Sequence, residues 1–338
     1  MAARYTNETG IPLSMAVWLA SDYYDYSEAG LSVTTMLRPI KQTILARRVS
    51  EEARVEDVAN RINSAMGNAF HDSVEKAWTT NHDTALALLG YPKAIRERVL
   101  VNPTKEELEA FNSNAKGGKA IPVYMEQRTK REFMGINISG KFDFVGDGRV
   151  EDIKSTTVYS YTMGSKDKDY ILQGSLYRWL NPELVTKDTM LINFIFTDWQ
   201  KAMARQQPEK YPQSRIQAKE FKLMSLRETE LWVRNRVKTL IDLIDADEDD
   251  LPMCSDEELW RSDPVYKYYK NPAKATERGA RSTKNFDTEA EALTRLREDG
   301  NVGIVKTIPG QVKACAYCPA FTVCKQKDAL IASGDLII

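Results

Sequence analysis

The residues of this chain with the clearest chemical potential are two aspartates and a lysine near its middle. Asp143 lies in the segment 140–145, and Asp152 and Lys154 lie in the segment 150–155, with an Asp-Gly pair in the link between them. Asp-Gly between alternating apolar runs predicts a β-hairpin, because a type I′ turn needs positive φ at both central residues. Since side chains alternate along a strand, this turn places Asp143 opposite Asp152, with Lys154 on the same face.

This arrangement predicts metal-dependent hydrolysis of phosphodiesters. Carboxylates directly opposite each other on paired strands repel, and a hard divalent cation such as Mg²⁺ or Mn²⁺ turns that repulsion into a binding site. Lys154 would then hold a nucleophilic water or stabilise developing negative charge. Phe142, Phe144 and Ile153 are expected on the opposite side, in a core. The alternative is a surface hairpin with a charged outer face.

A histidine upstream of the hairpin is a further candidate. His71 is one of only two histidines, and it lies one turn before Glu75 in a segment, 67–78, that is expected to be helical. The imidazole is either a metal ligand or the partner of Glu75. Glu126, on the strand expected before the hairpin, either joins the same site or pairs with a basic residue across the sheet.

A polar pair follows the hairpin. Gln173 and Tyr177 are spaced i, i+4 on one stripe of an amphipathic helix expected over 170–180. Two readings stay open for this pair, an ordinary helix face and a pair of side chains that faces the hairpin site.

All four cysteines lie in the last quarter of the chain. Cys315, Cys318 and Cys324 form a C-x₂-C-x₅-C pattern, and Cys254 precedes them. Thiolates at this spacing suit a soft metal centre. Two disulfides are the alternative, but no secretion signal is expected at the N-terminus and a chain of 338 residues does not need covalent staples.

Composition indicates a soluble globular protein. The chain is 42% hydrophobic and 28% charged, its mean hydropathy is −0.46, and no apolar run has transmembrane length. A net charge of −1 gives no general attraction to nucleic acid, so DNA binding would need local basic patches. The basic groups are Lys41, Arg47 and Arg48; Lys93, Arg96 and Arg98; Lys201, Arg205 and Lys210; and Arg278, Arg281 and Lys284. The first and the last are the preferred candidates.

The expected elements place the hairpin inside a larger sheet. Residues 1–30 are expected to be irregular, with a tyrosine-rich stretch at 22–26 that could stack bases or pack. Helices are expected over 33–66, around His71 and on to about residue 114, at 170–180 and at 226–243, and strands at 122–130, 133–145, 149–157, 190–196 and 216–223. The glycine-rich stretch at 112–119 lacks the spacing of a phosphate-binding loop, so a connecting loop is expected there.

Taken together, these motifs resemble the PD-(D/E)XK nuclease superfamily, in its RecB-like and phage-exonuclease branch. Asp143 corresponds to the first acid and Asp152-Ile153-Lys154 to the (D/E)-x-K element. The resemblance implies that His71, Asp143, Asp152 and the Ile153 carbonyl bind Mg²⁺ or Mn²⁺. It implies that Lys154 positions water and that Gln173 and Tyr177 orient DNA.

The cysteine pattern resembles that of relatives with a C-terminal iron–sulfur cluster. The resemblance implies a [4Fe–4S] cluster held by Cys254, Cys315, Cys318 and Cys324, with structural Zn²⁺ as the alternative. The sequence departs from those relatives in one respect, because no cysteine lies near the N-terminal segment 31–39, where their fourth ligand usually precedes the core.

The fold expected from this resemblance is α/β (α+β), a restriction-endonuclease-like core whose central mixed sheet is flanked by helices. We expect an N-terminal segment over 1–50 packing on the core, the nuclease core over 51–250 and a metal or iron–sulfur region over 251–338. The expected activity is a metal-dependent DNA exonuclease of phage type, in the cytoplasm of a bacterial host. DNA and a single-strand annealing or other recombination protein are the expected partners, with no membrane. The alternatives are an endonuclease or nickase on the same fold and an inactive DNA-binding scaffold protein.

Overall fold

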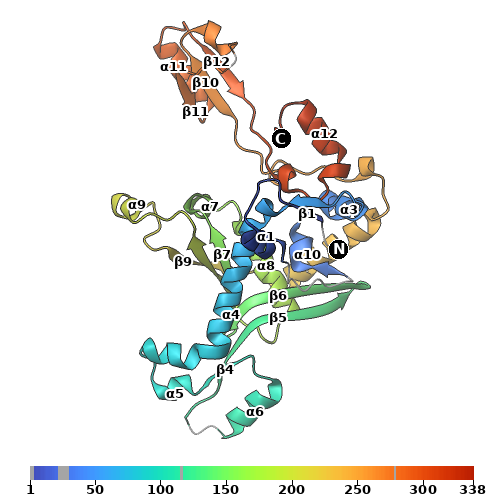
Figure 1. Ribbon diagram of the computed structural model, residues 1–338, viewed down its shortest axis with the longest axis vertical. Coiled ribbons are helices and arrows are strands. Elements are labelled where there is room, and N and C mark those ends of the chain that lie inside the picture. Colours follow the sequence, from blue (N-terminus) through green and yellow to red (C-terminus); the bar gives the residue numbers. More distant parts are fainter. Residues whose placement is uncertain (1–3, 22–29, 115–116, 278) are drawn as a thin grey trace. The chain divides into compact units, whose positions relative to one another are not determined.

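The central element of the protein is a mixed seven-stranded β-sheet (Figure 1). The computed structural model describes residues 4–21, 30–114, 117–277 and 279–338. The tyrosine-rich stretch at 22–26, Arg278 of the last basic group and residues 115–116 of the glycine-rich stretch therefore lie outside the described residues.

The sheet runs in the order β4-β5-β6-β7-β8-β9, with β2 added alongside β6. Its strands are β2 (Leu31–Ser32), β4 (Val99–Val101), β5 (Ile121–Phe133), β6 (Ile136–Gly146), β7 (Arg149–Thr156), β8 (Thr189–Phe196) and β9 (Ile216–Lys222). Three pairs are parallel, β4 with β5, β7 with β8 and β2 with β6, and the other three are antiparallel. The ends of the five longest strands lie within two residues of the predicted ends, with two exceptions. Strand β5 ends, and β6 begins, three residues later than expected.

The predicted hairpin is confirmed as β6–β7. Asp147 has φ of 49° and Gly148 has φ of 72°, as a type I′ turn requires. Phe144 pairs with Glu151, and Gly146 pairs with Arg149. The register is therefore the predicted one, which places Asp143 of β6 opposite Asp152 of β7.

Helices pack on this sheet, which gives the predicted α/β architecture with a central mixed sheet flanked by helices. Before residue 244, apart from α3 (Ile40–Arg48), the α-helices are α1 (Leu13–Ala20), α2 (Val33–Leu37), α4 (Ile62–Leu88), α5 (Lys93–Arg96), α6 (Lys105–Asn114), α7 (Val158–Met163), α8 (Asp167–Leu180), α9 (Lys201–Gln206) and α10 (Leu226–Leu243) among the described residues. Helix α8 approaches the sheet closely at Gly174, where an added Cβ would lie 2.2 Å from Met190 Sδ. An alanine there would therefore require the Met190 side chain or the helix to shift.

Three segments differ from the sequence-based expectation: the N-terminal stretch expected to be irregular contains α1, and two regions expected to be helical contain strands. Residues 33–66 are not one helical region: α2 ends before Pro39, α3 (Ile40–Arg48) follows, and β3 (Val55–Asp57) pairs with β1 (Arg4–Thr6) in a small parallel sheet. Strand β4 likewise interrupts the region expected to be helical up to residue 114. In both cases the strand forms by pairing with a partner far away in the sequence, which local periodicity does not reveal.

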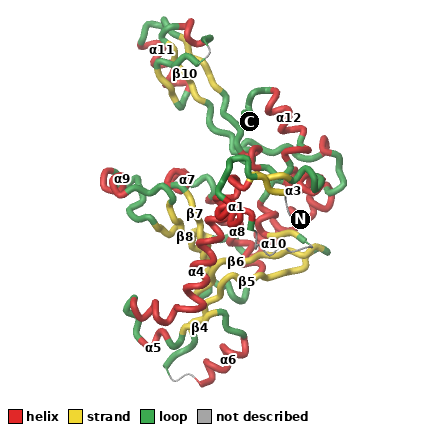
Figure 2. Tube along the Cα trace, in the orientation of Figure 1, coloured by secondary structure: helices red, strands yellow, loops and turns green. Residues whose placement is uncertain are grey.

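The chain divides by internal packing into two units. Unit 1 comprises Met1–Arg38 and Val55–Thr239 and contains the seven-stranded sheet, and unit 2 comprises Pro39–Arg54 and Leu240–Ile338. Unit 2 contains α3, a three-stranded antiparallel sheet and two further helices (Figure 2): β10 (Val265–Tyr269), β11 (Lys284–Phe286), β12 (Ile304–Ile308), α11 (Glu289–Glu298) and α12 (Lys325–Ala332). None of the described helices is long and apolar enough to cross a membrane.

Lys41 and Arg48 of the first basic group predicted to contact DNA make structural contacts within unit 2, whereas Arg47 is exposed and its contact with DNA stays a prediction. Lys41 is only 3% exposed, and its Nζ lies 3.6 Å from Glu248 Oε1 within unit 2. Arg48 donates hydrogen bonds to the carbonyls of Ile244 and Ala246. The prediction for Lys41 is therefore wrong, because its charge is buried and already paired.

Candidate active site

Helix α4 and strands β5 and β6 bring an imidazole and two carboxylates together in unit 1. Nδ1 of His71, on α4, lies 3.4 Å from Glu126 Oε1 and 3.4 Å from Asp143 Oδ1. Among the described residues, which include all four cysteines, this is the one set of three or more His, Cys, Asp or Glu ligand atoms within 4.8 Å of one another. The partner of His71 is therefore this acidic pair across the sheet, and no ion pair with Glu75 is found in the described structure.

Glu126 reaches this site from a distorted point of β5. Its φ is 51°, in the left-handed region that costs a non-glycine residue about 1–2 kcal/mol. The β5–β6 ladder pairs Met125 with Phe144 and Gln127 with Phe142, but it skips Glu126. Asn102 supports the distortion, since its Oδ1 accepts hydrogen bonds from Met125 N–H at 2.7 Å and from the Gln127 side chain at 3.2 Å. Backbone strain maintained in this way is typical of functional positions.

The second acid of the hairpin is more deeply buried. Asp152 is 1% exposed, and Lys154 Nζ lies 2.6 Å from its Oδ2. Despite this ion pair, neither carboxylate oxygen has a hydrogen-bond partner of normal geometry among the described residues. Asp143 links the two strands of the hairpin to His71. Its Oδ1 lies 3.4 Å from His71 Nδ1, and its Oδ2 accepts a hydrogen bond from Ile153 N–H at 2.8 Å.

The charges of these residues shift one another's pKa values. Burial, followed by the negative charge of Asp152, raises the pKa of Asp143 to about 7. Burial alone would lower the pKa of His71, but its hydrogen bond with Glu126 and the charge of Asp143 outweigh burial and raise it. In the same way the charges of Asp152 and Asp143 outweigh burial at Lys154 and raise its pKa, so Lys154 remains an ammonium ion.

These residues fit a divalent metal ion. Buried carboxylates repay their desolvation when they are paired or bind a cation, and the Asp152 oxygens lack hydrogen-bond donors of normal geometry among the described residues. Carboxylate oxygens suit Mg²⁺ and Mn²⁺, and an imidazole is a ligand more typical of transition ions. The structure thus contains a possible divalent-metal site formed by His71, Glu126 and Asp143.

The raised pKa of Asp143 predicts a stability effect without any measurement of activity. An acid whose pKa is raised on folding, here from 3.8 to about 7, contributes stability that is complete below the unfolded pKa and is lost as pH rises through the folded pKa. Asp143→Asn should therefore stabilise the metal-free protein by a few kcal/mol at pH 8 and by almost nothing near pH 4. Urea unfolding in EDTA at both values of pH measures this difference.

The matched control is Asp147→Asn, at the exposed turn of the same hairpin. The pKa of Asp147 is lowered by its hydrogen bond with Lys187, so no gain is expected at pH 8. Adding Mn²⁺ at pH 8 should stabilise the wild type but not Asp143→Asn. Equal stabilisation of both proteins by Mn²⁺ would contradict a role for Asp143 in metal binding.

The other predicted site residues lie nearby in unit 1. Gln173 and Tyr177 are on α8, as expected, and Gln173 Nε2 donates a hydrogen bond of 3.0 Å to Tyr177 Oη. Tyr177 is only 4% exposed, and its ring packs beside Gly140 of β6. A contact with DNA through Gln173 and Tyr177, and metal binding through the Ile153 carbonyl, both stay predictions.

Sequence reasoning missed one charged residue at this site. Lys141 forms an ion pair with Glu126, and this pair raises the pKa of Lys141 in spite of burial. Lys141 lies two residues before Asp143 on β6, so strand alternation could have placed it on the same face. Glu126 thus contacts both His71 and Lys141, which combines the two roles that the sequence left open.

The four cysteines lie in unit 2, where all four are free thiols, so the two-disulfide alternative is not realised. Burial, followed by the charges of Glu258 and the other three thiols, raises the pKa of Cys254 to about 12. Gln326 links Cys254 to the C-terminal segment, accepting from its N–H at 2.9 Å and donating to its carbonyl at 3.0 Å. The sulfurs do not form a set of three within 4.8 Å, whereas zinc bound by thiolates at about 2.3 Å needs sulfurs about 3.8 Å apart. Metal binding by these cysteines, as a [4Fe–4S] cluster or as Zn²⁺, stays a prediction.

Comparison with known proteins identifies the family. A sequence profile of the PD-(D/E)XK nuclease superfamily matches residues 45–325, which is more than half of the chain. This protein therefore belongs to the PD-(D/E)XK nuclease superfamily. No curated protein matches its sequence.

Solved structures show more distant similarity. The protein is similar to a crystal structure of SSO0001, with a TM-score of 0.38 and 13% identity, over 68% of this chain and 87% of that one. It is also similar to the crystal structure of a phage related exonuclease from Haemophilus somnus 129PT, with a TM-score of 0.27 and 16% identity, over 62% of this chain and 91% of that one.

Proposed function

We propose that this protein is a Mg²⁺- or Mn²⁺-dependent deoxyribonuclease that degrades DNA from its ends. The observation that carries the proposal is the arrangement of His71, Glu126 and Asp143 within reach of one ion. Beside them, Lys154 lies against the buried carboxylate of Asp152. A protein with no chemistry to perform gains nothing from burying opposed acids at this point, because like charges across a strand pair destabilise the fold.

In this proposal each side chain has a defined task. His71, Glu126, Asp143 and Asp152 hold the metal, with the Ile153 carbonyl as the further ligand implied by the family resemblance. A bound divalent ion supplies Lewis-acid polarisation of the phosphate and a more acidic water. Lys154 is held as an ammonium ion by Asp152 and Asp143, so it orients the attacking water and stabilises charge on the phosphate; it is not the general base. Gln173 and Tyr177 position the DNA backbone beside it.

The form of the DNA substrate tests the mode of attack. Linear duplex DNA with Mg²⁺ or Mn²⁺ should be shortened progressively, while a covalently closed circle should survive, because an end-dependent nuclease needs a free terminus. EDTA should abolish degradation of the linear DNA. Gel electrophoresis of both substrates over a time course measures these rates.

Two outcomes of this experiment favour the alternatives. Nicking or linearisation of the circle at a rate comparable to loss of the linear DNA indicates an endonuclease or nickase on the same fold. Binding of DNA without cleavage under all metal conditions indicates a DNA-binding scaffold protein. The expected biological role, DNA recombination or processing with a single-strand annealing or other recombination protein, depends on the end-dependent outcome.

We also propose that Cys254, Cys315, Cys318 and Cys324 hold a [4Fe–4S] cluster. Support comes from the convergence of the four thiols, since each of the other three raises the pKa of Cys254. Four thiolates are also the number of ligands that such a cluster needs. The cluster would link Cys254 to the C-terminal segment and so stabilise a small core formed by Leu259, Val312, Cys315, Leu330 and Leu336.

A further inference from the structure

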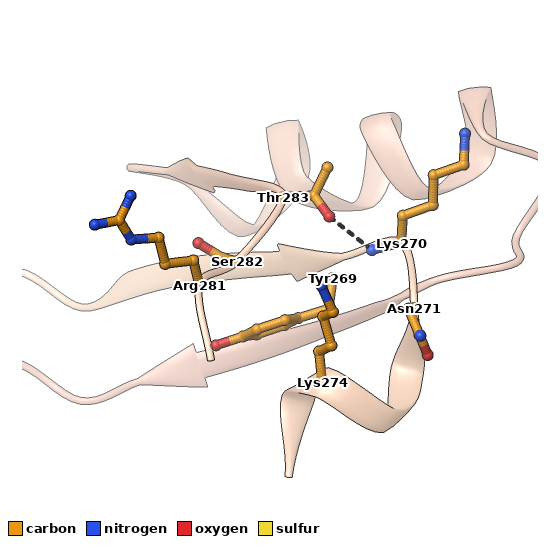
Figure 3. Close-up of a pocket in the computed structure, with 7 residues that line it drawn as sticks. All are labelled: Tyr269, Lys270, Asn271, Lys274, Arg281, Ser282 and Thr283. Atoms are coloured by element: carbon orange, nitrogen blue, oxygen red, sulfur yellow. Dashed lines mark hydrogen bonds between the residues drawn. The ribbon is translucent and has the colours of Figure 1, made fainter. Parts of the chain in front are cut away.

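Unit 2 contains a basic pocket on its three-stranded sheet. The pocket has a volume of about 450 Å³ and lies where β10 ends and the chain leads into β11 (Figure 3). It is lined by Tyr269, Lys270, Asn271, Lys274, Arg281, Ser282 and Thr283. Three of these seven residues are cationic and none is acidic, and Tyr269 is the one large apolar group among them. Pockets for small organic ligands are lined mainly by apolar and aromatic side chains, so this lining indicates an anionic ligand.

The three cations of this pocket are available to a ligand. Lys270, Lys274 and Arg281 are exposed, and within the described part of the chain none of them has a carboxylate within ion-pair distance. The charge of Lys270 acts on Asp299 from a distance, but that carboxylate is already bound by the Tyr268 hydroxyl at 2.8 Å. Three cations around one pocket, with no acidic residue in its lining, form a positive surface.

Neutral hydrogen-bond donors of the pocket are also oriented for an anion. Thr283 Oγ1 accepts from Lys270 N–H at 3.0 Å, so its hydroxyl hydrogen can be donated elsewhere. Asn271 Oδ1 accepts from Ala273 N–H at 3.1 Å, which leaves the side-chain NH₂ group as a donor. Lysine, arginine, threonine and asparagine donors are those that proteins use to contact the phosphates of nucleic acids.

The directions of the side chains distinguish a polyanion from a single small anion. Figure 3 shows the Tyr269 ring between Lys274 and Arg281, with the Lys270 and Arg281 side chains extending away from each other. One phosphate ion cannot contact charges that diverge in this way, whereas successive phosphates of a DNA strand can. The basic group predicted from Arg281 and its neighbours points to the same ligand.

We propose that this pocket is an accessory binding site for the phosphodiester backbone of DNA, separate from the nuclease site and contributing affinity without sequence specificity. The inference rests on the proposed function, since it supplies a grip on the same substrate. This pocket of unit 2 would supply the attraction to DNA that a net charge of −1 does not provide.

The test compares two triple variants that carry the same change in charge. The pocket variant is Lys270→Gln with Lys274→Gln and Arg281→Gln. The control is Lys105→Gln with Lys119→Gln and Lys130→Gln, exposed cations of unit 1 that line no such pocket. Fluorescence anisotropy with a labelled DNA duplex in EDTA measures Kd over a range of salt concentrations, and circular dichroism checks that both variants are folded.

The pocket variant should bind DNA about tenfold more weakly or worse. The slope of log K against log salt should become shallower by about 2.7, because each of the three lost phosphate contacts removes about 0.9. The control should keep the wild-type slope. Equal losses in both variants, a wild-type slope in the pocket variant, or tighter binding of RNA than of DNA at the pocket would overturn this inference. If the wild-type protein cleaves DNA but one of these results is found, only the proposed role of the pocket is wrong. If the wild-type protein neither binds nor cleaves DNA, the proposed function is wrong as well.

Discussion

Asp152→Ala is expected to reduce DNA cleavage by about 10³-fold or more. Its carboxylate is almost fully buried, lies against Lys154, and has no hydrogen-bond donor of normal geometry among the described residues. Removing it also removes its repulsion of Asp143, so the metal-free variant should melt at the same temperature as the wild type or higher. Cleavage assays with Mg²⁺ and Mn²⁺, together with melting in EDTA, measure both effects.

Lys154→Ala provides the complementary result. It should lose activity to a similar extent, but it should destabilise the metal-free protein, because two neighbouring carboxylates then lack their cation. Opposite effects on stability with the same effect on activity are not expected of residues that act only in folding. The control is Glu151→Gln, next to Asp152 but paired with Arg149 and Asn193. Full cleavage activity of Asp152→Ala would contradict the assignment of the active site. A loss of activity in Glu151→Gln as large as that in Asp152→Ala would contradict it as well.

Cys318→Ser is expected to have the largest effect on the stability of unit 2. If the four cysteines hold a [4Fe–4S] cluster, protein purified without oxygen should be brown, with a broad visible absorption band. The cluster closes a loop of ~60 residues between Cys254 and Cys315, so its loss should lower the melting temperature by about 10 °C. Activity should fall as a consequence of unfolding, and limited proteolysis should cut unit 2 first.

Thr322→Ser is the matched control, because Thr322 is exposed and lies between Cys318 and Cys324. It should keep the colour, the iron content and the melting temperature of the wild type. Colourless wild-type protein with stoichiometric zinc would reject the iron–sulfur cluster and keep the structural role of the cysteines. Metal-free protein with four freely reactive thiols would reject both.

The sequence alone determined the parts of this protein that depend on local patterns. The Asp-Gly turn set the register of the β6–β7 hairpin, since a type I′ turn allows one alignment of its strands. The apolar run of β8 and the period of α8 predicted those elements within a few residues. The family followed from the order of short motifs along the chain, and the sequence profile of the family supports it over residues 45–325.

The tertiary structure decided everything that depends on contacts between distant segments. Strands β3 and β4 exist because they pair with β1 and β5, and Lys41 is buried because Glu248 lies against it. Glu126 joins His71 only because the β5 backbone adopts a left-handed conformation there, and no residue pattern specifies such strain in a glutamate. The pKa of Asp143 likewise depends on burial and on Asp152 together. Local propensity acts over a few residues, whereas burial and charge act through space, so only the folded chain fixes the chemistry of this site.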